Sequence, residues 1–224
     1  FKGYTIKLGD NLHLNYENWT PIGATGKFEG TFDGNGKAIE GLRVYTKNGA
    51  SAGLFASCRG TIKNLTVIDA EIYGTYKAGV IVGDGLCAKI ENCHVEDAIV
   101  KIVPLNEDDA NHAGGIVGYL SGEPVAYVKG SSVKNAEIFA FRDVAGIAGC
   151  ANSAAEVSGN TVENVTVTAD QTVKYVSNEK DGNAAAVAGR LSNKAVVKDN
   201  NVDENVVVIR KVDTTKEMEY AVAD

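Results

Sequence analysis

The chain has 224 residues, of which 44% are hydrophobic and 23% charged, so it can bury a substantial core and is neither low-complexity nor disordered. A formal net charge of -7 without a Lys/Arg cluster argues against nucleic acid and anionic membranes as partners. No apolar stretch approaches the roughly 18 residues of a transmembrane helix, so direct membrane insertion is not expected. The first residues carry no signal peptide, and the missing initial Met suggests a processed segment.

Many short alternating Val and Ile runs, 25 glycines and only 3 prolines favour β structure with tight turns. In chain order, residues 1–27 are predicted to form an atypical first coil that caps the core. Residues 28–210 form the repeats, and residues 211–224 form a C-terminal cap or tail of the same continuous domain. Such caps are expected because the open end of a stack would expose edge strands.

A six-residue unit recurs six times along the predicted repeats. Each unit begins and ends with an apolar residue, while the residues between them vary. The third residue is always Gly, Asn or Asp, which suits a corner with a positive φ. The units begin at Ile39, Ile62, Ile90, Val128, Val157 and Val197. The steps between them vary from 23 residues (39 to 62) to 40 residues (157 to 197), so the strands repeat while the loops vary.

Stacking the units in register predicts continuous columns of like residues. The first positions form an Ile/Val column, and the last positions form a Val column from Val44 to Val202. The charges at the second position mostly alternate in sign, and opposite charges stabilise neighbouring strands, which lie about 4.8 Å apart. In chain order these residues are Glu40, Lys63, Glu91, Lys129, Ser158 and Lys198. We therefore predict an all-β, right-handed parallel β-helix (solenoid) of about six coils. A β-propeller fits less well, because its blades need about 40 residues.

A second repeated element precedes each unit after the first. It reads Ala52-Gly-Leu-Phe-Ala56 at its first occurrence and Ala113-Gly-Gly-Ile-Val-Gly118 at its third. A phosphate-binding loop would need a following helix N-terminus and usually a Lys, and neither follows here. The glycines are predicted to let the coils turn or pack closely.

Two segments, Trp19-Thr-Pro-Ile-Gly23 and Phe32-Asp-Gly-Asn-Gly36, together with the glycine-containing elements, resemble bacterial GLUG-motif repeat proteins. The resemblance covers most of residues 3–210. It implies a β-helix fold and a secreted or cell-surface location in a larger protein of a group often classed as adhesins. It implies no catalytic residues. The chain departs from the pattern at Ala184-Ala-Ala-Val-Ala-Gly189, where the first glycine is lost.

Neither a metal site nor a cofactor is predicted. The four cysteines lack zinc-binding spacing; Cys93 aligns with Leu65 as a core residue, whereas Cys58 and Cys87 could form a disulfide between coils. The stacked pair Asp69 and Asp97 could share a cation or a proton, but a structural role in a turn ladder is the favoured interpretation.

The long intervals between units are the predicted binding elements, because they leave the same corner of successive coils. Their aromatic and arginine side chains could bind an extracellular glycan or protein, or could simply cover the bases of the loops. The candidate residues are Tyr73, Tyr76, Phe139, Phe141, Arg142 and Tyr175.

The predicted function is a non-enzymatic adhesin-like module, or a rigid spacer in a surface protein. The alternative is a carbohydrate-active β-helix enzyme, a polysaccharide lyase or glycoside hydrolase. Such an enzyme would need carboxylates that converge with an acid or cationic partner. The three histidines fall in different positions of the repeat, and none has a nearby nucleophile arrangement, so no catalytic residue is predicted.

Overall fold

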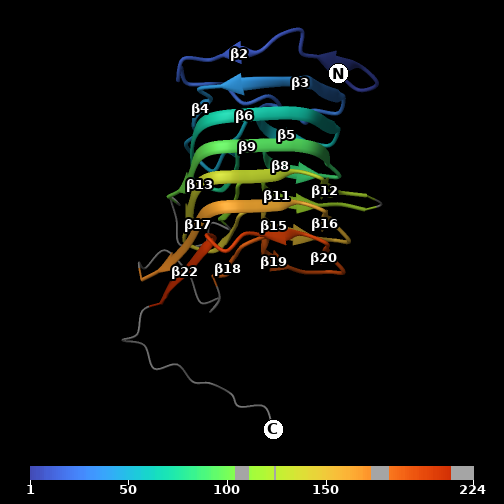
Figure 1. The fold of residues 1–224 in the computed structure, drawn as a ribbon. Helices are drawn as coiled ribbons and strands as arrows, with labels where there is room; N and C mark the ends of the chain where they lie inside the picture. The colour runs from blue at the N-terminus through green and yellow to red at the C-terminus, as the bar shows by residue number, and fades with distance from the viewer. Residues whose placement is uncertain (104–110, 124, 173–181, 213–224) are drawn as a thin grey trace.

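The computed structural model of the protein describes residues 1–103, 111–123, 125–172 and 182–212. These residues build a β-solenoid in which each coil stacks on the one before it (Figure 1). The strand pairs of the described residues are parallel, which agrees with a solenoid and not with the antiparallel blades of a propeller. Within the same ranges there is no helix long and apolar enough to cross a membrane.

The largest sheet has 13 strands and runs along the whole stack. Its members are β1 (Thr5–Lys7), β2 (Leu12–His13), β3 (Thr31–Glu40), β4 (Arg43–Tyr45), β6 (Thr61–Gly74), β9 (Lys89–Ile102), β12 (Tyr127–Lys129), β13 (Ser132–Ala140), β16 (Glu156–Ser158), β17 (Thr161–Gln171), β20 (Val196–Lys198), β21 (Asn201–Val202) and β22 (Val207–Val212).

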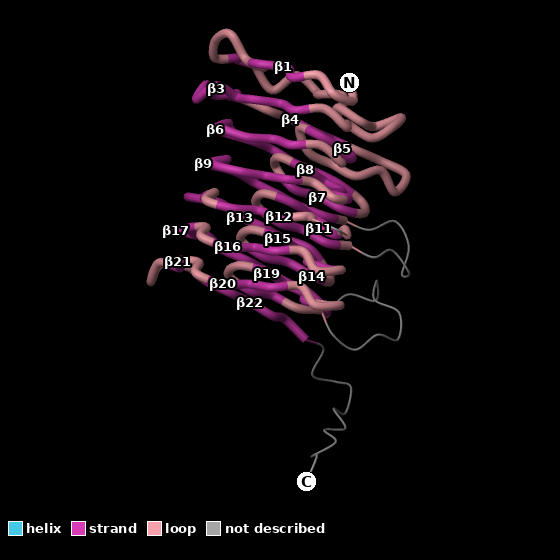
Figure 2. The backbone as a smooth tube through the Cα atoms, turned by 90° about the vertical axis from the view of Figure 1, so that its right-hand side faces the viewer, coloured by secondary structure: helices cyan, strands magenta, loops and turns pink. Residues whose placement is uncertain are grey.

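Two smaller sheets complete the wall of the solenoid (Figure 2). The four-stranded sheet contains β7 (Lys77–Gly79), β10 (His112–Gly114), β14 (Asp143–Ala145) and β18 (Ala184–Ala185). The five-stranded sheet contains β5 (Phe55–Cys58), β8 (Val82–Leu86), β11 (Val117–Ser121), β15 (Ala148–Asn152) and β19 (Ala188–Leu191). A coil therefore visits the large sheet, the four-stranded sheet and the five-stranded sheet in turn, as β6, β7 and β8 do before β9.

Two corners bend each of the 14-residue strands β6 and β9 of the large sheet. In β6 they lie at Asn64 and Asp69, whose φ angles are 54° and 56°. Asn and Asp tolerate this left-handed conformation better than most residues that have a Cβ atom. Because Asn92 and Asp97 repeat both corners in β9, with φ angles of 50° and 54°, the bends stack from coil to coil.

The structure corrects the register of the first predicted unit. Ile39 pairs with Val67, whereas Phe32 pairs with Ile62. Phe32 therefore takes the place of Ile39 in the column of first positions, and the step to Ile62 is 30 residues (32 to 62) rather than 23. Likewise Val44 pairs with Ile72 and does not belong to the predicted Val column.

The error has a physical cause, because the two corners of one coil share the same sequence pattern. Around each corner an apolar residue is followed two positions later by a left-handed residue and five positions later by another apolar residue. Ile39, Gly41 and Val44 fit the second corner as well as the first, and Gly41 does have a φ of 70°. The register of β3 also shifts between Asp33 and Lys37, which hides the true alignment.

The remaining units align as predicted. Ile62, Ile90, Val128, Val157 and Val197 pair in one column, and Val67 to Val202 form the other. Their side chains fill the interior of the solenoid and, before the last coil, are fully buried. Cys93 pairs with Leu65 and is buried, as predicted, and all four cysteines are free thiols.

The glycine-containing elements form a tight arch between the two smaller sheets. A Cβ atom on Gly118 would lie 2.6 Å from the backbone nitrogen of Ala78 and 2.8 Å from the carbonyl oxygen of His112. Side chains do not fit at such distances, so glycine lets β11 approach the neighbouring sheet. The predicted role of these glycines in close packing is confirmed.

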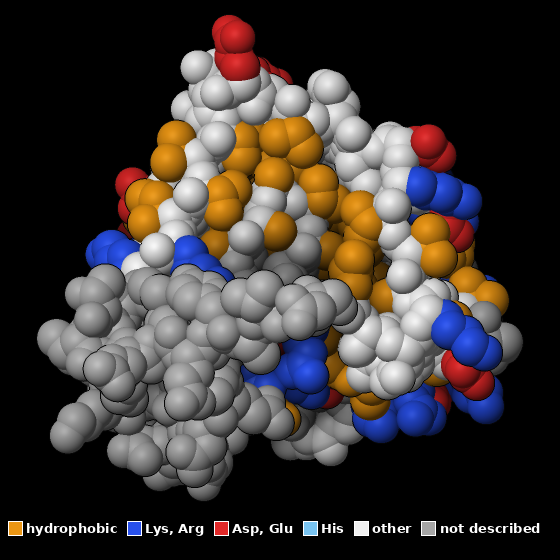
Figure 3. Space-filling view, turned by 90° about the horizontal axis from the view of Figure 1, so that it is seen from below, with side chains coloured by type: hydrophobic (Ala, Val, Ile, Leu, Met, Phe, Trp, Pro, Cys, Tyr) orange, Lys and Arg blue, Asp and Glu red, His pale blue; other side chains and the backbone are white. Residues whose placement is uncertain are grey.

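The two ends of the stack differ. Residues 1–27 continue the parallel pairing, since Ile6 pairs with Phe32 and Leu12 with Ile39, and their partly buried side chains pack on the core. At the C-terminal end, Val202 is 43% exposed although Val162 in the same column is fully buried. Figure 3 views the molecule from this end and shows hydrophobic side chains on its surface. Residues 213–224 of the predicted C-terminal cap lie outside the described residues.

Candidate functional site

A ladder of outward-facing side chains follows the corner where β4 and β6 end. Tyr45 pairs with Tyr73, Tyr73 pairs with Lys101, and Lys101 pairs with Phe139. These four residues, which we call the corner ladder, come from successive coils. The described starts of three predicted binding segments, at Tyr73, Lys101 and Phe139, lie on this ladder.

A groove with a volume of about 550 Å³ opens at the N-terminal end of the corner ladder. We call it the tyrosine groove. Tyr45 is 57% exposed and Tyr16 is 41% exposed, so both rings are accessible to a ligand. The lining residues are Tyr16, Asn18, Arg43, Tyr45 and Tyr73.

Polar contacts hold the wall of the tyrosine groove in place. The Nε atom of Arg43 lies 3.1 Å from Oε2 of Glu71 on the neighbouring coil. Asn18 accepts a hydrogen bond of 2.8 Å from the backbone N–H of Tyr45. Both contacts join adjacent coils, so the groove is supported by the stack itself rather than by a single loop.

Tyr16, which lines the groove, connects it to the second corner of β6 at Asp69. Its hydroxyl donates a hydrogen bond to Asp69. This hydrogen bond to a carboxylate, together with the negative charge of Asp69, raises the pKa of Tyr16 above its usual value. The phenol is therefore neutral at physiological pH and available as a hydrogen-bonding group.

The carboxylates of Asp69 and Asp97 occupy equivalent corners of β6 and β9. Asp97 accepts a hydrogen bond of 3.0 Å from Asn135 in the next coil, and Asn135 in turn accepts one of 2.8 Å from Asn164. Across the described ranges, no three His, Cys, Asp or Glu side chains are grouped so as to hold a metal ion. The contacts support the turn-ladder interpretation of this pair.

The other predicted binding residues do not share one surface. Phe139 is partly exposed, and its ring lies edge-on to Phe141 at 5.2 Å between centroids. Phe141 is only 7% exposed, which corrects its predicted place on the binding surface: it is a buried ring that supports Phe139. Tyr76 and Arg142 lie next to the four-stranded sheet, and Tyr175 lies outside the described residues.

A second polar cluster lies where the two smaller sheets face each other across the arch. We call it the polar seam, formed by Lys77, Asp84, His112, Tyr119 and Asp143. The Nζ atom of Lys77 is 3.2 Å from Oδ2 of Asp84 and 4.3 Å from the ring centroid of Tyr119. Nδ1 of His112 is 2.9 Å from Oδ2 of Asp143, and both side chains are almost fully buried.

The polar seam has the side chains of an acid-base site without an activated nucleophile. Burial lowers the pKa of His112, although the carboxylate of Asp143 opposes the shift. Cys150, which pairs with Tyr119, is also buried, and burial raises the pKa of its thiol to about 11. The thiol is therefore protonated at neutral pH and a poor nucleophile.

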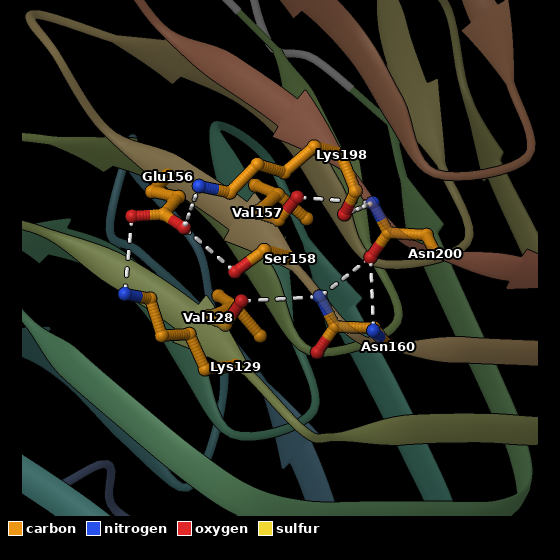
Figure 4. A network of polar contacts seen from close by, with 8 residues as sticks. All are labelled: Val128, Lys129, Glu156, Val157, Ser158, Asn160, Lys198 and Asn200. Atoms are coloured by element: carbon orange, nitrogen blue, oxygen red, sulfur yellow. Dashed lines mark hydrogen bonds and ion pairs between the residues drawn. The ribbon is translucent and has the colours of Figure 1, made fainter.

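The outer face of the large sheet carries a third polar network (Figure 4). Glu156 accepts contacts from Lys129 at 3.0 Å, Lys198 at 3.2 Å and the hydroxyl of Ser158 at 2.9 Å. Hydrogen bonds from Lys129, Ser158 and Lys198 lower the pKa of Glu156 to about 2. Glu156, a residue outside the predicted column of alternating charges, supplies the negative charge between Lys129 and Lys198, and the network joins three coils. At the other end of that column the structure corrects the prediction, because Glu40 pairs with Ile68 and Asp33 is the residue beside Lys63.

Sequence reasoning found Tyr73 but missed Tyr45, Arg43, Asn18 and Tyr16. With the first unit in the wrong register, Tyr45 aligns with Ile68 instead of Tyr73, so the two tyrosines are not recognised as neighbours. Only the true register brings the two tyrosines together. An alignment that began at Phe32 and allowed for the two-residue shift between Asp33 and Lys37 would have carried this signal.

The comparisons with known proteins bear on the fold alone. The scan against protein-family models matches no family, and the search of curated proteins matches none either. Among solved structures, the chain is similar to one described as "a putative immunoglobulin A1 protease from Bacteroides ovatus", with a TM-score of 0.61 and 17% sequence identity. The match covers 94% of this chain and 68% of that chain, so it extends over nearly the whole solenoid.

Proposed function

We propose that this chain is a non-enzymatic glycan-binding module that presents the tyrosine groove on a rigid β-solenoid. The observation that carries the proposal is the pairing of Tyr45 with Tyr73 in an open groove that also contains Arg43 and Asn18. Aromatic faces stack against the C–H faces of sugar rings, while polar groups beside them bond to the hydroxyl edges. The groove offers both kinds of contact.

The carboxylates next to the groove support a binding role over a catalytic one. Glu71 is engaged by Arg43, and Asp69 is engaged by the hydroxyl of Tyr16. A glycoside hydrolase needs two carboxyl groups that face the same sugar linkage, one of them able to give a proton. The paired state of Glu71 and Asp69 leaves them poorly suited to that chemistry.

The finer architecture and the setting of the module belong to the same proposal. We infer a right-handed winding, the hand that parallel crossover connections nearly always take, and about six coils. The resemblance to GLUG-motif repeat proteins favours a bacterial cell-surface or secreted location within a larger, adhesin-like protein. The extracellular glycan would be its partner, bound without a cofactor.

A glycan array probed with the full chain, followed by a depolymerisation assay on each glycan that binds, tests the proposal. We expect binding to a defined set of glycans and no shortening of the bound chains. Tyr45→Ala and Tyr73→Ala should weaken binding, whereas Tyr4→Ala, which removes an exposed tyrosine outside the groove, should leave it unchanged. Binding that survives the loss of both groove tyrosines, capture of proteins alone, or product release by the unmodified chain would overturn the proposal.

A further inference from the structure

The geometry points to an uncharged, linear oligosaccharide that lies parallel to the solenoid axis and extends from the tyrosine groove to Phe139. This inference rests on the proposed function and specifies the shape, charge and direction of the ligand. It assigns a distal contact to Lys101 and Phe139, which lie beyond the groove on the corner ladder.

The corner ladder has the length and the direction of an extended binding track. Each rung lies on the next coil, so the rungs follow one another at about 4.8 Å. Three such steps separate Tyr45 from Phe139, which amounts to about 14 Å along the axis. A single sugar ring in the groove cannot reach Phe139, whereas a chain of about three or four rings can span the distance between the two residues.

The distal end of the ladder is a built surface rather than a loose loop. Phe139 belongs to β13 and remains partly exposed while Phe141 supports its ring from the side. Its register partners on the two neighbouring strands are Lys101 on one side and Thr168 on the other. A ring held in this way loses little conformational freedom when a ligand stacks on it.

The charges along the track favour an uncharged ligand. The column beside the corner ladder runs from Arg43 through Glu71 and Ile99 to Glu137. Arg43 is paired with Glu71. Lys101 belongs to the coil between the coil of Glu71 and the coil of Glu137, so positive and negative groups are mixed along the track. Neither a uniformly acidic nor a uniformly basic polymer matches such a surface.

The test uses length series of cello-, xylo-, manno-, chito- and malto-oligosaccharides from two to six rings, with the full chain in a calorimeter. In the series that binds, affinity should rise with length until the ligand spans Tyr45 to Phe139, and then level off. Phe139→Ala should remove this gain, about tenfold, while leaving the affinity for the two-ring ligand unchanged. Lys101→Ala is a second distal variant that keeps both Phe139 and Phe141. It should likewise weaken the binding of the longer ligands and leave the two-ring ligand unchanged.

Thr168→Tyr adds an aromatic rung at the next level of the ladder and should raise the affinity for the longest ligands only. A length-independent affinity, or an equal loss for short and long ligands in both distal variants, would overturn the axial track while leaving the proposed function intact. Oligogalacturonides of the same lengths are titrated as the charged comparison, and tighter binding of these than of the uncharged chains would overturn the charge assignment. Failure of every oligosaccharide to bind would overturn the proposed function and this inference together.

Discussion

Tyr45 pairs with Tyr73 across the parallel strands β4 and β6, so that two phenol rings from successive coils line one groove. Parallel stacking places equivalent residues of neighbouring coils next to each other, and it therefore converts a residue that recurs once per coil into a continuous surface. The binding surface is thus a consequence of the repeat, even though the two tyrosines lie in different units of the sequence.

Truncation of Tyr73 should weaken glycan binding more than truncation of Tyr76. Tyr73 lines the groove, whereas Tyr76 stacks beside Lys77, with 4.9 Å between the ammonium and the ring centroid. We expect Tyr73→Ala to cost about 1.4 kcal/mol of binding free energy, a tenfold loss of affinity. Calorimetric titration of both variants measures the difference. Equal losses of affinity in the two variants would contradict the groove as the binding site and would indicate that the ligand also contacts the region of the polar seam.

Addition of one methyl group at Gly118 should destabilise the arch. The new Cβ atom would lie 2.6 Å from the backbone nitrogen of Ala78, and backbone atoms cannot yield as a side chain can. Gly118→Ala should therefore lower the free energy of unfolding by about 2 kcal/mol or more. Gly26→Ala is the matched control, because a Cβ atom there would meet no atom within 4 Å. Urea unfolding of the two variants should separate them clearly, and similar midpoints would speak against the tight arch.

The interior valines should differ in importance along the stack. Val162 is fully buried, whereas Val202 in the same column is 43% exposed. We expect Val162→Ala to cost about 2 kcal/mol in unfolding free energy and Val202→Ala less than about half of that, since a cavity forms only where packing is complete. Thermal and urea unfolding provide the measurement. A larger effect at Val202 would mean that the last coil is covered in the native protein.

The polar seam should make stability depend on pH through His112. Burial lowers the pKa of His112 below its value of about 6.5 in an unfolded chain, so the unfolded state binds the proton more readily. The stability is therefore complete above the unfolded pKa and decreases as the pH falls through and below it. Asp143 opposes the shift, and Lys77 and Arg142 add to it.

His112→Gln should reduce this dependence between about pH 8 and pH 5, measured as the free energy of urea unfolding. His13→Gln serves as the control, because His13 is exposed and its Nδ1 atom lies 2.8 Å from Oε2 of the exposed Glu40. If the unmodified protein and the His112 variant lose stability in parallel as the pH falls, the seam has no such role.

The fold could be predicted from the sequence because apolar and corner residues recur in every coil. The same recurrence explains the main error: Ile39 matches both corners of a coil, and only the pairing of Phe32 with Ile62 decides between them. The stacking of Tyr73, Lys101 and Phe139 at one corner was also predictable, because each lies at the same position of its coil. The groove was not, since Tyr16 and Asn18 reach it from the first coil, whose sequence departs from the repeat.

Chemical-shift mapping of the full chain, titrated with the tightest-binding uncharged oligosaccharide, tests the location of the binding site most directly. We predict that the perturbed resonances belong to Tyr16, Tyr45 and Tyr73, and with longer ligands also to Phe139. Perturbations confined to His112 and the rest of the polar seam, or an unchanged spectrum at saturating ligand, would contradict the assignment of the tyrosine groove as the glycan-binding site.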